Sequence, residues 1–342
     1  MEFKERYSEA LPRLRKAGYV FAGPSEHSAV KTCLWTKRSI RNEGTCYKQK
    51  FYGINSHRCL QMTPAMPACN QRCVFCWRDT SIFSNNWPEG IPVDEPARII
   101  DDCVQGQRKL LTGFKGNEKA DKGKWLEAQD PNQAAISLDG EPTMYPKISE
   151  LVAEFHSRGF TTFIVTNGTR PETLRKLAAD GNLPTQLYVS LCAPNEDTYN
   201  KTNLPVSPDN WRLLNETIEL FPSLDTRKAI RITLVKSLND SKPEAYARLV
   251  KKSQADFVEC KSYMAIGYSR ERLGPDYMLS HDEVRAFAEA LAEASGYLVA
   301  DEQESSRVVL LCRDEEALAN RLIKSKQGRI KRRKTLAPIS AP

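Results

Sequence analysis

Hydrophobic and polar residues follow two alternating patterns along most of the chain: a short apolar run, then an amphipathic stretch of helical period. The apolar runs predict strands at 60–66, 134–138, 160–166, 186–191, 229–235 and 256–260, and the amphipathic stretches predict helices at 94–113, 146–158, 171–180, 195–201, 208–220 and 242–253. A helix at 281–295 and strands at 297–300 and 307–312 are expected to follow. This order is typical of βα units in a parallel sheet. Six strands before the last helix favour an open (β/α)6 partial TIM barrel over a closed eight-stranded one.

Three other segments have their own character. Residues 4–18 predict an amphipathic helix, and the charged residues 115–131, which include Gly and Pro, predict a surface insertion or loop. Residues 24–59 show little periodicity, and such a stretch in a compact protein usually needs something to organise it. We therefore divide the chain into an N-terminal extension at 1–59, a barrel at 60–320 and a basic, flexible tail at 321–342.

Composition adds little to this picture except at the tail. The 342 residues are 40% hydrophobic, enough for a large core, and no apolar run is long enough to cross a bilayer. The first residues do not open a signal peptide, so we expect a soluble cytoplasmic protein without a membrane partner. The net charge is +7, and residues 324–334 alone carry seven Lys and Arg and no acidic residue. That tail is expected either to contact nucleic acid or to be a solvated end.

Cysteine spacing carries the clearest chemistry. Cys69, Cys73 and Cys76 stand at C-x3-C-x2-C spacing just after the first predicted strand. Three thiolates can hold three irons of a [4Fe-4S] cluster and leave the fourth iron open to S-adenosylmethionine, the source of a 5′-deoxyadenosyl radical. The alternative is a zinc knuckle, which needs a fourth ligand, and the nearest downstream thiol, Cys103, falls in a predicted helix.

A second set of evenly spaced thiols, Cys33, Cys46 and Cys59, lies in the irregular N-terminal extension. Ten cysteines in a chain expected in the reducing cytosol are more often ligands than disulfides. The second set therefore suggests another iron–sulfur cluster. The alternatives to a second cluster are a zinc site with His57 as fourth ligand and a set of buried structural cysteines.

Polar residues end several predicted strands, where a barrel of this kind carries its active site. Gly140 and Glu141 follow the second strand, where a glycine lets the backbone approach a ligand and the carboxylate faces the amino group of S-adenosylmethionine. Asn167 after the third strand and Ser190 at the end of the fourth are candidates to bind ribose or carboxylate. The Asn-Gly pair at 167–168 is equally explained as a simple turn.

The whole pattern resembles the archaeal tRNA 4-demethylwyosine synthases over nearly all of residues 1–320. The segments that carry the resemblance are CNQRCVFCWRD at 69–79, SLDGEPTMYP at 137–146, TNGT at 166–169, VSLCAPN at 189–195 and KSYMAIGYSR at 261–270. The order and spacing of Cys33, Cys46 and Cys59 match the second cluster of that family, which implies two [4Fe-4S] clusters. The family's eukaryotic members carry a flavodoxin-like domain that has no counterpart here, so the resemblance implies a separate electron donor of flavodoxin or ferredoxin type.

The resemblance also implies a reaction. The substrate would be 1-methylguanosine at position 37 of tRNA-Phe, next to the anticodon, and pyruvate would supply two carbons. The radical would take hydrogen from the methyl group, the methylene radical would add to the pyruvate carbonyl carbon, and loss of the carboxyl group with ring closure would give 4-demethylwyosine. Lys48 corresponds to the lysine that forms a Schiff base with pyruvate, although among Lys50 and Arg58 it would otherwise be taken as a surface charge.

A base in an anticodon loop must turn out to reach a barrel interior. Trp77, Tyr263 and Tyr268 are candidates to stack on it or, equally, core residues, and Arg270 and Arg272 are candidates to contact phosphate. We expect a monomer. The alternatives are another radical S-adenosylmethionine RNA modifier, such as a methylthiotransferase or methyltransferase, and a zinc-stabilised tRNA-binding protein without catalysis.

Overall fold

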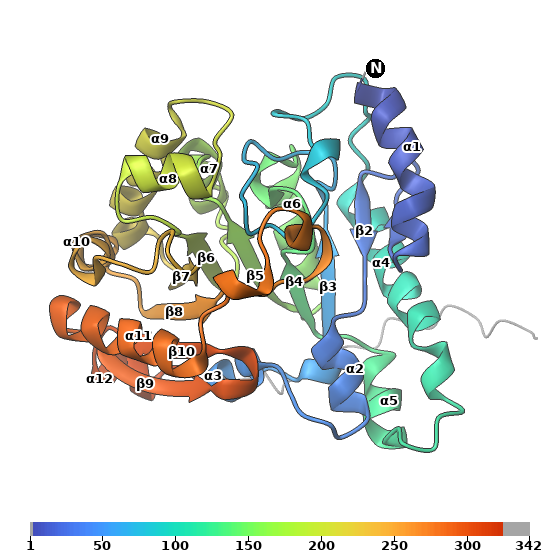
Figure 1. The fold of residues 1–342 in the computed structure, drawn as a ribbon. Helices are drawn as coiled ribbons and strands as arrows, with labels where there is room; N and C mark the ends of the chain where they lie inside the picture. Colours follow the sequence, from blue (N-terminus) through green and yellow to red (C-terminus); the bar gives the residue numbers. More distant parts are fainter. Residues whose placement is uncertain (1–2, 324–342) are drawn as a thin grey trace, which may run out of the picture.

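A ten-stranded sheet organises the computed structural model, which describes residues 3–323 (Figure 1). The strand order is β1-β2-β3-β4-β5-β6-β7-β8-β10-β9, and the six strands from β3 to β8 run parallel. The strands are β1 (Val20–Ala22), β2 (Ser28–Val30), β3 (Cys59–Thr63), β4 (Gln133–Ile136), β5 (Thr161–Thr166), β6 (Gln186–Ser190), β7 (Arg227–Leu234), β8 (Phe257–Ser262), β9 (Leu298–Gln303) and β10 (Val308–Cys312). The six parallel strands confirm the predicted open partial barrel.

Helices follow the strands as the pattern predicted. They are α1 (Phe3–Lys16), α2 (Leu34–Ile40), α3 (Tyr47–Tyr52), α4 (Pro96–Leu110), α5 (Lys122–Ala128), α6 (Ile148–Ser157), α7 (Pro171–Ala179), α8 (Glu196–Thr202), α9 (Asn210–Leu220), α10 (Pro243–Ser253), α11 (His281–Ser295) and α12 (Glu315–Ala319). None of these helices is long and apolar enough to span a bilayer. The predicted basic tail lies almost wholly beyond residue 323, outside the described residues.

Strict alternation of side chains divides the sheet into two faces. Ile164 and Leu187 belong to a large core with residues of helices α4, α6, α7, α9, α10 and α11, which cover the outer face. Their neighbours Phe163 and Tyr188 point to the opposite, inner face and pack against residues of α3. The same parity places Arg231, Glu259 and Lys261 on the inner face, so the interior is only partly apolar.

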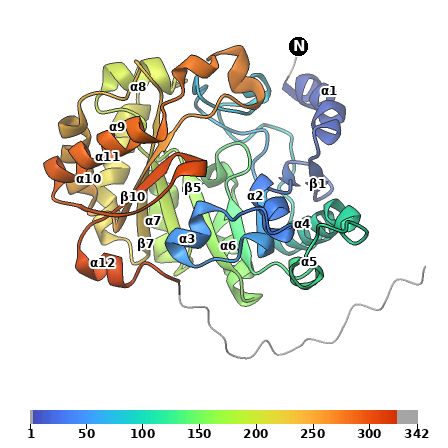
Figure 2. The same cartoon turned by 60° about the horizontal axis from the view of Figure 1, so that its bottom comes forward.

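Antiparallel strands extend the sheet at both ends. Strands β1 and β2 extend it beyond β3, and β10 and β9 extend it beyond β8. Figure 2 shows α2 and α3 near the foot of the barrel, and in Figure 1 they lie at the end opposite the loops that follow β3. Within segment 24–59, α3 packs against the inner face of the barrel, β2 is a strand of the sheet, and Ile40 of α2 packs with Ala128 of α5.

Residues 115–131 and the N-terminal extension at 24–59 contain helices that the hydrophobic pattern did not predict. The surface loop expected at 115–131 contains α5. Its N-cap residue is Asp121, whose carboxylate accepts from Lys124 N at 3.0 Å. Its Ala128 packs with Ile40 and Leu111, so this segment is attached to the N-terminal extension. Helices α2, α3 and α5 have six or seven residues each, too few for a helical period to stand out.

A pair of glycines tests the packing of α4 on the edge of the sheet. A methyl group on Gly106 would lie 2.8 Å from Val30 Cγ1 and 2.9 Å from Val20 Cγ1, whereas one on Gly113 would meet nothing within 4 Å. We expect Gly106→Ala to destabilise the protein by about 1 kcal/mol, because overpacking exceeds the gain in helix propensity. Thermal unfolding should shift down by about 3 °C. Gly113→Ala should leave the midpoint unchanged or slightly higher, and equal midpoints for the two variants would contradict this packing.

Candidate active site

Backbone hydrogen bonds fix the loop that carries Cys69, Cys73 and Cys76. Cys69 N donates to Ser84 O at 2.9 Å, and Cys76 N donates to Cys73 O at 3.0 Å. Val74 N donates to Thr202 O at 2.9 Å, which ties the loop to the end of α8. The loop is thus attached on both sides before any cofactor is considered.

Two arginines hold the same loop through its carbonyl groups. Arg72 Nη1 donates to Cys69 O at 2.7 Å, and its Nη2 donates to Phe83 O at 2.8 Å. Arg272 Nε donates to Val74 O at 3.2 Å, and its Nη2 donates to Cys76 O. Arg272, a candidate phosphate ligand from its sequence, is therefore engaged with the cysteine loop, whereas Arg270 is exposed. The sequence could not predict the hydrogen bonds of Arg72 and Arg272. Both side chains bind backbone carbonyl groups, and Arg272 is far from the cysteine loop in the sequence.

The turn after β4 touches this loop directly at Gly140. Gly140 has a φ of +63°, and a Cβ there would lie 1.9 Å from Ala65 O and 2.9 Å from Ala68 O. The next residue, Glu141, donates its N–H to Ala68 O at 2.6 Å. Gly140 is therefore required for the close approach of two backbone segments, as its place in the sequence suggested, and the partner seen here is the cysteine loop.

The Glu141 carboxylate joins the turns that follow β4 and β5. Its Oε1 accepts from the hydroxyls of Thr143 and Thr166, both at 2.6 Å, and its Oε2 accepts from Asn167 N at 2.8 Å. Burial raises the pKa of Glu141, and these donors lower it. Asn167 in turn donates from Nδ2 to Asn70 Oδ1 at 2.8 Å, so its side chain reaches the cysteine loop.

The second set of thiols comes from three separate elements. Cys33 and Cys46 are the N-cap residues of α2 and α3, and Cys59 opens β3. Burial raises the pKa of all three thiols, that of Cys46 to about 12. Cys33 raises the pKa of the other two, and Lys48 lowers the pKa of all three. The three thiols and Lys48 are thus brought together.

Helix α3 carries Lys48 into the barrel. The Lys48 side chain is only 8% exposed, and its Nζ lies 4.4 Å from the ring centroid of Tyr188 and 5.0 Å from that of Phe163. Burial, and then the nearby Arg231, lower the pKa of Lys48 to about 8. About a tenth of this amine is therefore neutral at pH 7, far more than for an exposed lysine, and the neutral amine is the form that attacks a carbonyl.

A buried network on β7 and β8 holds α3 in this position. The Glu259 carboxylate, with no exposed surface, accepts from Tyr47 OH at 3.0 Å and Tyr52 OH at 2.8 Å. Arg231 donates to Glu259 Oε2 from Nε at 3.1 Å and from Nη2 at 3.0 Å, and to Tyr47 OH at 2.8 Å. Both tyrosines flank Lys48 along α3, so the network sets where the Lys48 amine lies. Ser190 pairs with Arg231 in the β6–β7 register and lies at the same level.

The donor chemistry of both cysteine sets fits iron–sulfur clusters. Buried thiols with raised pKa values stay protonated unless a cation stabilises the thiolate, which a metal cluster does. His57, which a zinc site would have used, is instead hydrogen-bonded through Nε2 to Glu127 at 2.6 Å. Within residues 3–323, no three His, Cys, Asp or Glu side chains converge tightly enough to hold a single metal ion. Six thiolates in two sets suit clusters of several irons better than single zinc ions.

Arg78 acts electrostatically on one thiol of each set. It lowers the pKa of Cys76 and, among smaller influences, that of Cys33. Arg78 also donates from Nη1 to Tyr19 OH at 2.8 Å, and the same tyrosine hydroxyl donates to Asp139 at 3.0 Å.

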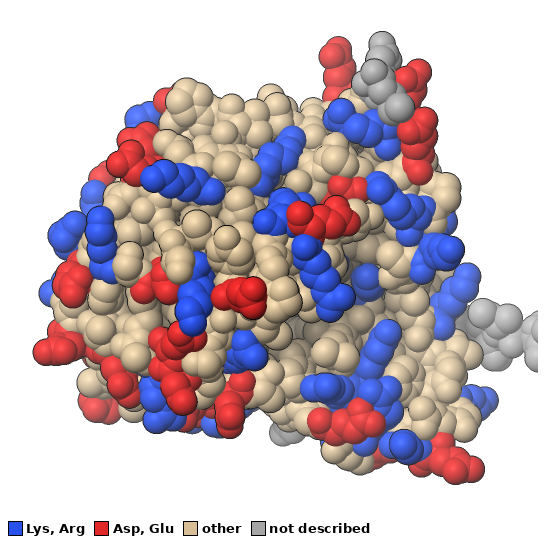
Figure 3. Space-filling model, viewed as in Figure 1, with Lys and Arg blue, Asp and Glu red and all other residues tan. Residues whose placement is uncertain are grey.

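Structure separates the three aromatic candidates. Tyr263 is buried and its hydroxyl donates to Leu273 O at 2.9 Å, so it is a core residue. Trp77 is 46% exposed, with Arg78 5.0 Å from its ring centroid, and Tyr268 N donates to Trp77 O at 3.1 Å. Figure 3 shows a hollow in the middle of the face drawn there, with Lys and Arg side chains and some Asp and Glu side chains beside it.

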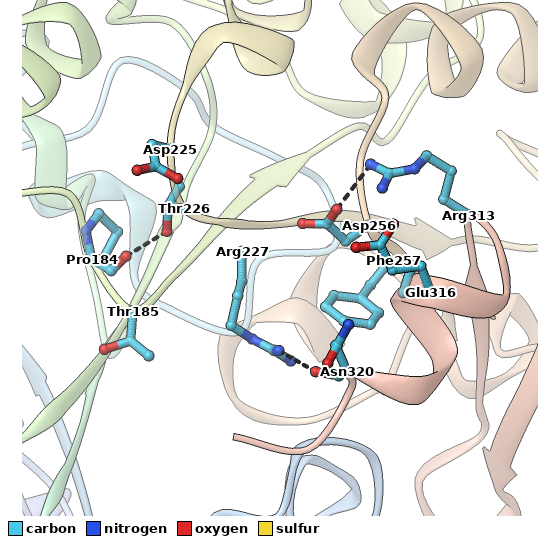
Figure 4. Close-up of a pocket in the computed structure, with 11 residues that line it drawn as sticks. Pro184, Thr185, Asp225, Thr226, Arg227, Asp256, Phe257, Arg313, Glu316 and Asn320 are labelled. Atoms are coloured by element: carbon cyan, nitrogen blue, oxygen red, sulfur yellow. Dashed lines mark hydrogen bonds and ion pairs between the residues drawn. The ribbon is translucent and has the colours of Figure 1, made fainter. Parts of the chain in front are cut away.

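A separate hollow of about 450 Å³ lies at the other end of the barrel, where β6, β7 and β8 begin (Figure 4). Two arginines that line it are hydrogen-bonded: Arg313 Nη1 donates to Asp256 Oδ1 at 2.9 Å, and Arg227 Nη1 donates to Asn320 O at 2.7 Å. It contains none of the candidate site residues.

The partial barrel with a three-cysteine loop after its first parallel strand defines a radical S-adenosylmethionine enzyme. The Radical SAM superfamily model matches residues 63–250, and a model for wyosine base formation matches residues 252–313. The chain belongs to the S-adenosyl-L-methionine-dependent tRNA 4-demethylwyosine synthases.

Relatives and solved structures match about nine tenths of this chain. The synthase of Pyrococcus horikoshii is 51% identical over 90% of this chain and 89% of its own, and that of Methanocaldococcus jannaschii is 38% identical over 87% and 94%. A structure of TYW1 with a lysine–pyruvate adduct bound is 36% identical, with a TM-score of 0.79 over 92% of this chain and 97% of its own. The crystal structure of archaeal TYW1 is 33% identical, with a TM-score of 0.74 over 92% and 99%.

Two glycines with positive φ give a controlled test of the Gly140 contact. Gly140→Ala adds a methyl group against Ala65 O, whereas Gly181→Ala has a φ of +70° and nothing within 4 Å of the new methyl group. Both should lose about 1 kcal/mol from the left-handed backbone. Only Gly140→Ala should also lose iron and S-adenosylmethionine binding, measured after anaerobic reconstitution. Normal iron content and binding in Gly140→Ala would show that the cysteine loop does not need this contact.

Proposed function

We propose that this enzyme converts 1-methylguanosine at position 37 of tRNA-Phe to 4-demethylwyosine, with pyruvate as the second substrate. The observation that carries the proposal is the placement of Lys48, a buried amine against the inner face of the barrel beside Cys33, Cys46 and Cys59. A relative 36% identical to this chain has been solved with a lysine–pyruvate adduct, which supports the same chemistry here. The reaction joins carbon to carbon with loss of the pyruvate carboxyl group, and so would be classed as a lyase reaction.

Each set of residues has a role in this proposal. Cys69, Cys73 and Cys76 hold one [4Fe-4S] cluster, and Cys33, Cys46 and Cys59 hold a second. With S-adenosylmethionine bound, the first cluster would supply the radical chemistry that takes hydrogen from the methyl group of the base. Gly140, Glu141, Asn167 and Ser190 are the residues that would bind S-adenosylmethionine. The Glu141 carboxylate acts mainly by orienting the turns after β4 and β5, because four protein donors already occupy it.

Lys48 would hold pyruvate as an imine. Its Nζ attacks the carbonyl carbon, the carbonyl oxygen leaves as water, and the keto carbon is then fixed inside the barrel. Aromatic rings on two sides exclude bulk water from the amine. The barrel mouth near Trp77 would receive the anticodon loop, with its target base turned out toward the interior.

The remaining partners follow from the same scheme. Electrons for the first cluster would come from a separate flavodoxin or ferredoxin-type donor, and the enzyme would act as a cytoplasmic monomer. We keep the division into an extension at 1–59, a barrel at 60–320 and a basic tail at 321–342 as a proposal, although β1 and β2 of the extension join the barrel sheet. The alternatives of a methylthiotransferase or methyltransferase reaction would need no buried lysine beside a second cysteine set.

Replacement of Lys48 tests the proposed imine. Lys48→Ala should reduce transfer of labelled pyruvate carbon to tRNA carrying 1-methylguanosine on the order of 100-fold or more, the scale of losing a reacting side chain. Lys50→Ala is the matched control, because Lys50 lies on the same helix but is about half exposed and paired with Asp301 at 2.8 Å. It should retain normal transfer. Normal product with Lys48→Ala would remove this lysine from the mechanism.

Iron analysis tests the two clusters separately. The wild-type protein should hold about eight irons per chain, and removal of either cysteine set should leave about four. Replacing Cys33, Cys46 and Cys59 with alanine should preserve 5′-deoxyadenosine formation while abolishing labelled product. Replacing Cys69, Cys73 and Cys76 should abolish both. Zinc without sulfide in the wild-type protein would reject the radical mechanism altogether.

A further inference from the structure

We propose that Arg231 binds the carboxylate of the keto acid at Lys48 and so makes the site select a charged carbonyl compound over a neutral one. This inference rests on the proposed function, because it assumes that Lys48 reacts with a keto acid. The inference assigns substrate recognition to Arg231, whereas Lys48 is the residue that reacts with the substrate.

Arg231 and Lys48 lie against the same aromatic ring. The Arg231 guanidinium carbon is 4.9 Å from the ring centroid of Tyr188, and Lys48 Nζ is 4.4 Å from it. The carboxylate of an α-keto acid is bonded directly to the carbon that Lys48 attacks. Because both cations lie against one ring, a keto acid on Lys48 would place its carboxylate within reach of the guanidinium.

The guanidinium retains hydrogen-bonding capacity that the protein does not use. Nε and Nη2 donate to Glu259 and Tyr47, but Nη1 donates to no group within residues 3–323. The side chain keeps 18% of its surface exposed, although Glu259 beside it has none. Because the other donors fix the plane of the guanidinium, Nη1 is presented in a set direction. It is suited to a carboxylate oxygen of a bound ligand.

The buried carboxylate beside Arg231 does not need the remaining donor. Glu259 already accepts from Tyr47 and Tyr52 and is paired with Arg231 through Nη2 at 3.0 Å. Nη1 is therefore left for a ligand, and a carboxylate is the acceptor that a guanidinium binds most strongly.

Reductive trapping tests this inference without tRNA or turnover. The reconstituted enzyme is incubated with pyruvate, or with the neutral ester methyl pyruvate, in the presence of cyanoborohydride, and labelling of Lys48 is measured by mass spectrometry. Loss of a charge-assisted hydrogen bond should raise the pyruvate concentration for half-maximal labelling about 10–100-fold in Arg231→Gln. Labelling by methyl pyruvate should change by less than about threefold, since the ester carries no charge for Arg231 to bind.

Two variants separate recognition from folding. Arg231→Gln leaves Glu259 buried without its cation, so the double variant Arg231→Gln/Glu259→Gln removes the pair together. In the double variant, the amide oxygen that replaces the Glu259 carboxylate can still accept from Tyr47 and Tyr52. We expect this variant to keep the reduced labelling of Lys48 by pyruvate and to show normal labelling by methyl pyruvate. Lys228→Gln is the control on the same strand, because Lys228 lies on the opposite face of β7 from Arg231 and its Nζ donates to Leu224 O at 3.4 Å. It should keep wild-type selectivity.

The outcomes are distinct. An equal loss of pyruvate and ester labelling in Arg231→Gln, restored in the double variant, would assign Arg231 a purely structural role and overturn the inference. Unchanged pyruvate labelling in Arg231→Gln would overturn it as well. Absence of any adduct on Lys48 in the wild-type enzyme would instead overturn the proposed function on which the inference rests.

Discussion

The carboxylate of Glu259 is buried without exposed surface, and the inner half of the barrel is arranged to satisfy it. A buried carboxylate left without donors costs several kcal/mol, so Tyr47, Tyr52 and Arg231 are held in place by a strong requirement. Two of these three residues lie on α3, a helix of six residues that has little stability of its own. The position of α3, and with it that of Lys48 and Cys46, therefore depends on one buried charge on β8, on the inner face of the sheet.

The barrel was predictable because its signal is local. Short apolar runs and amphipathic stretches of ordinary length repeat regularly, and the expected strands and the longer helices agree with the structure to within a few residues at each end. The first cysteine loop was predictable for the same reason, since its three thiols fall within eight residues. Gly140, Glu141, Asn167 and Ser190 were candidates because they stand at the ends of predicted strands. In the structure, the first three lie against or beside the cysteine loop.

What the sequence could not supply is long-range pairing. Lys48 stands among basic residues and looks exposed, and only the docking of α3 buries it. Arg272 looked like a phosphate ligand until its carbonyl partners in the cysteine loop were visible, and Tyr263 looked as available as Trp77 until its hydroxyl was found in the core. In each case the residue type was informative, but its surroundings were set by a segment distant in the chain.

The two cysteine sets differ in how much of the chain must fold before each can serve as a site. The first set closes a loop of a few residues, so its thiols are near one another even in a partly folded chain. The second set draws on the starts of α2, α3 and β3, and its thiols meet only after α3 has docked on Glu259. Assembly of the enzyme would then have a built-in order, in which the radical-generating half can be loaded first and the substrate-holding half is completed only on a correctly folded barrel.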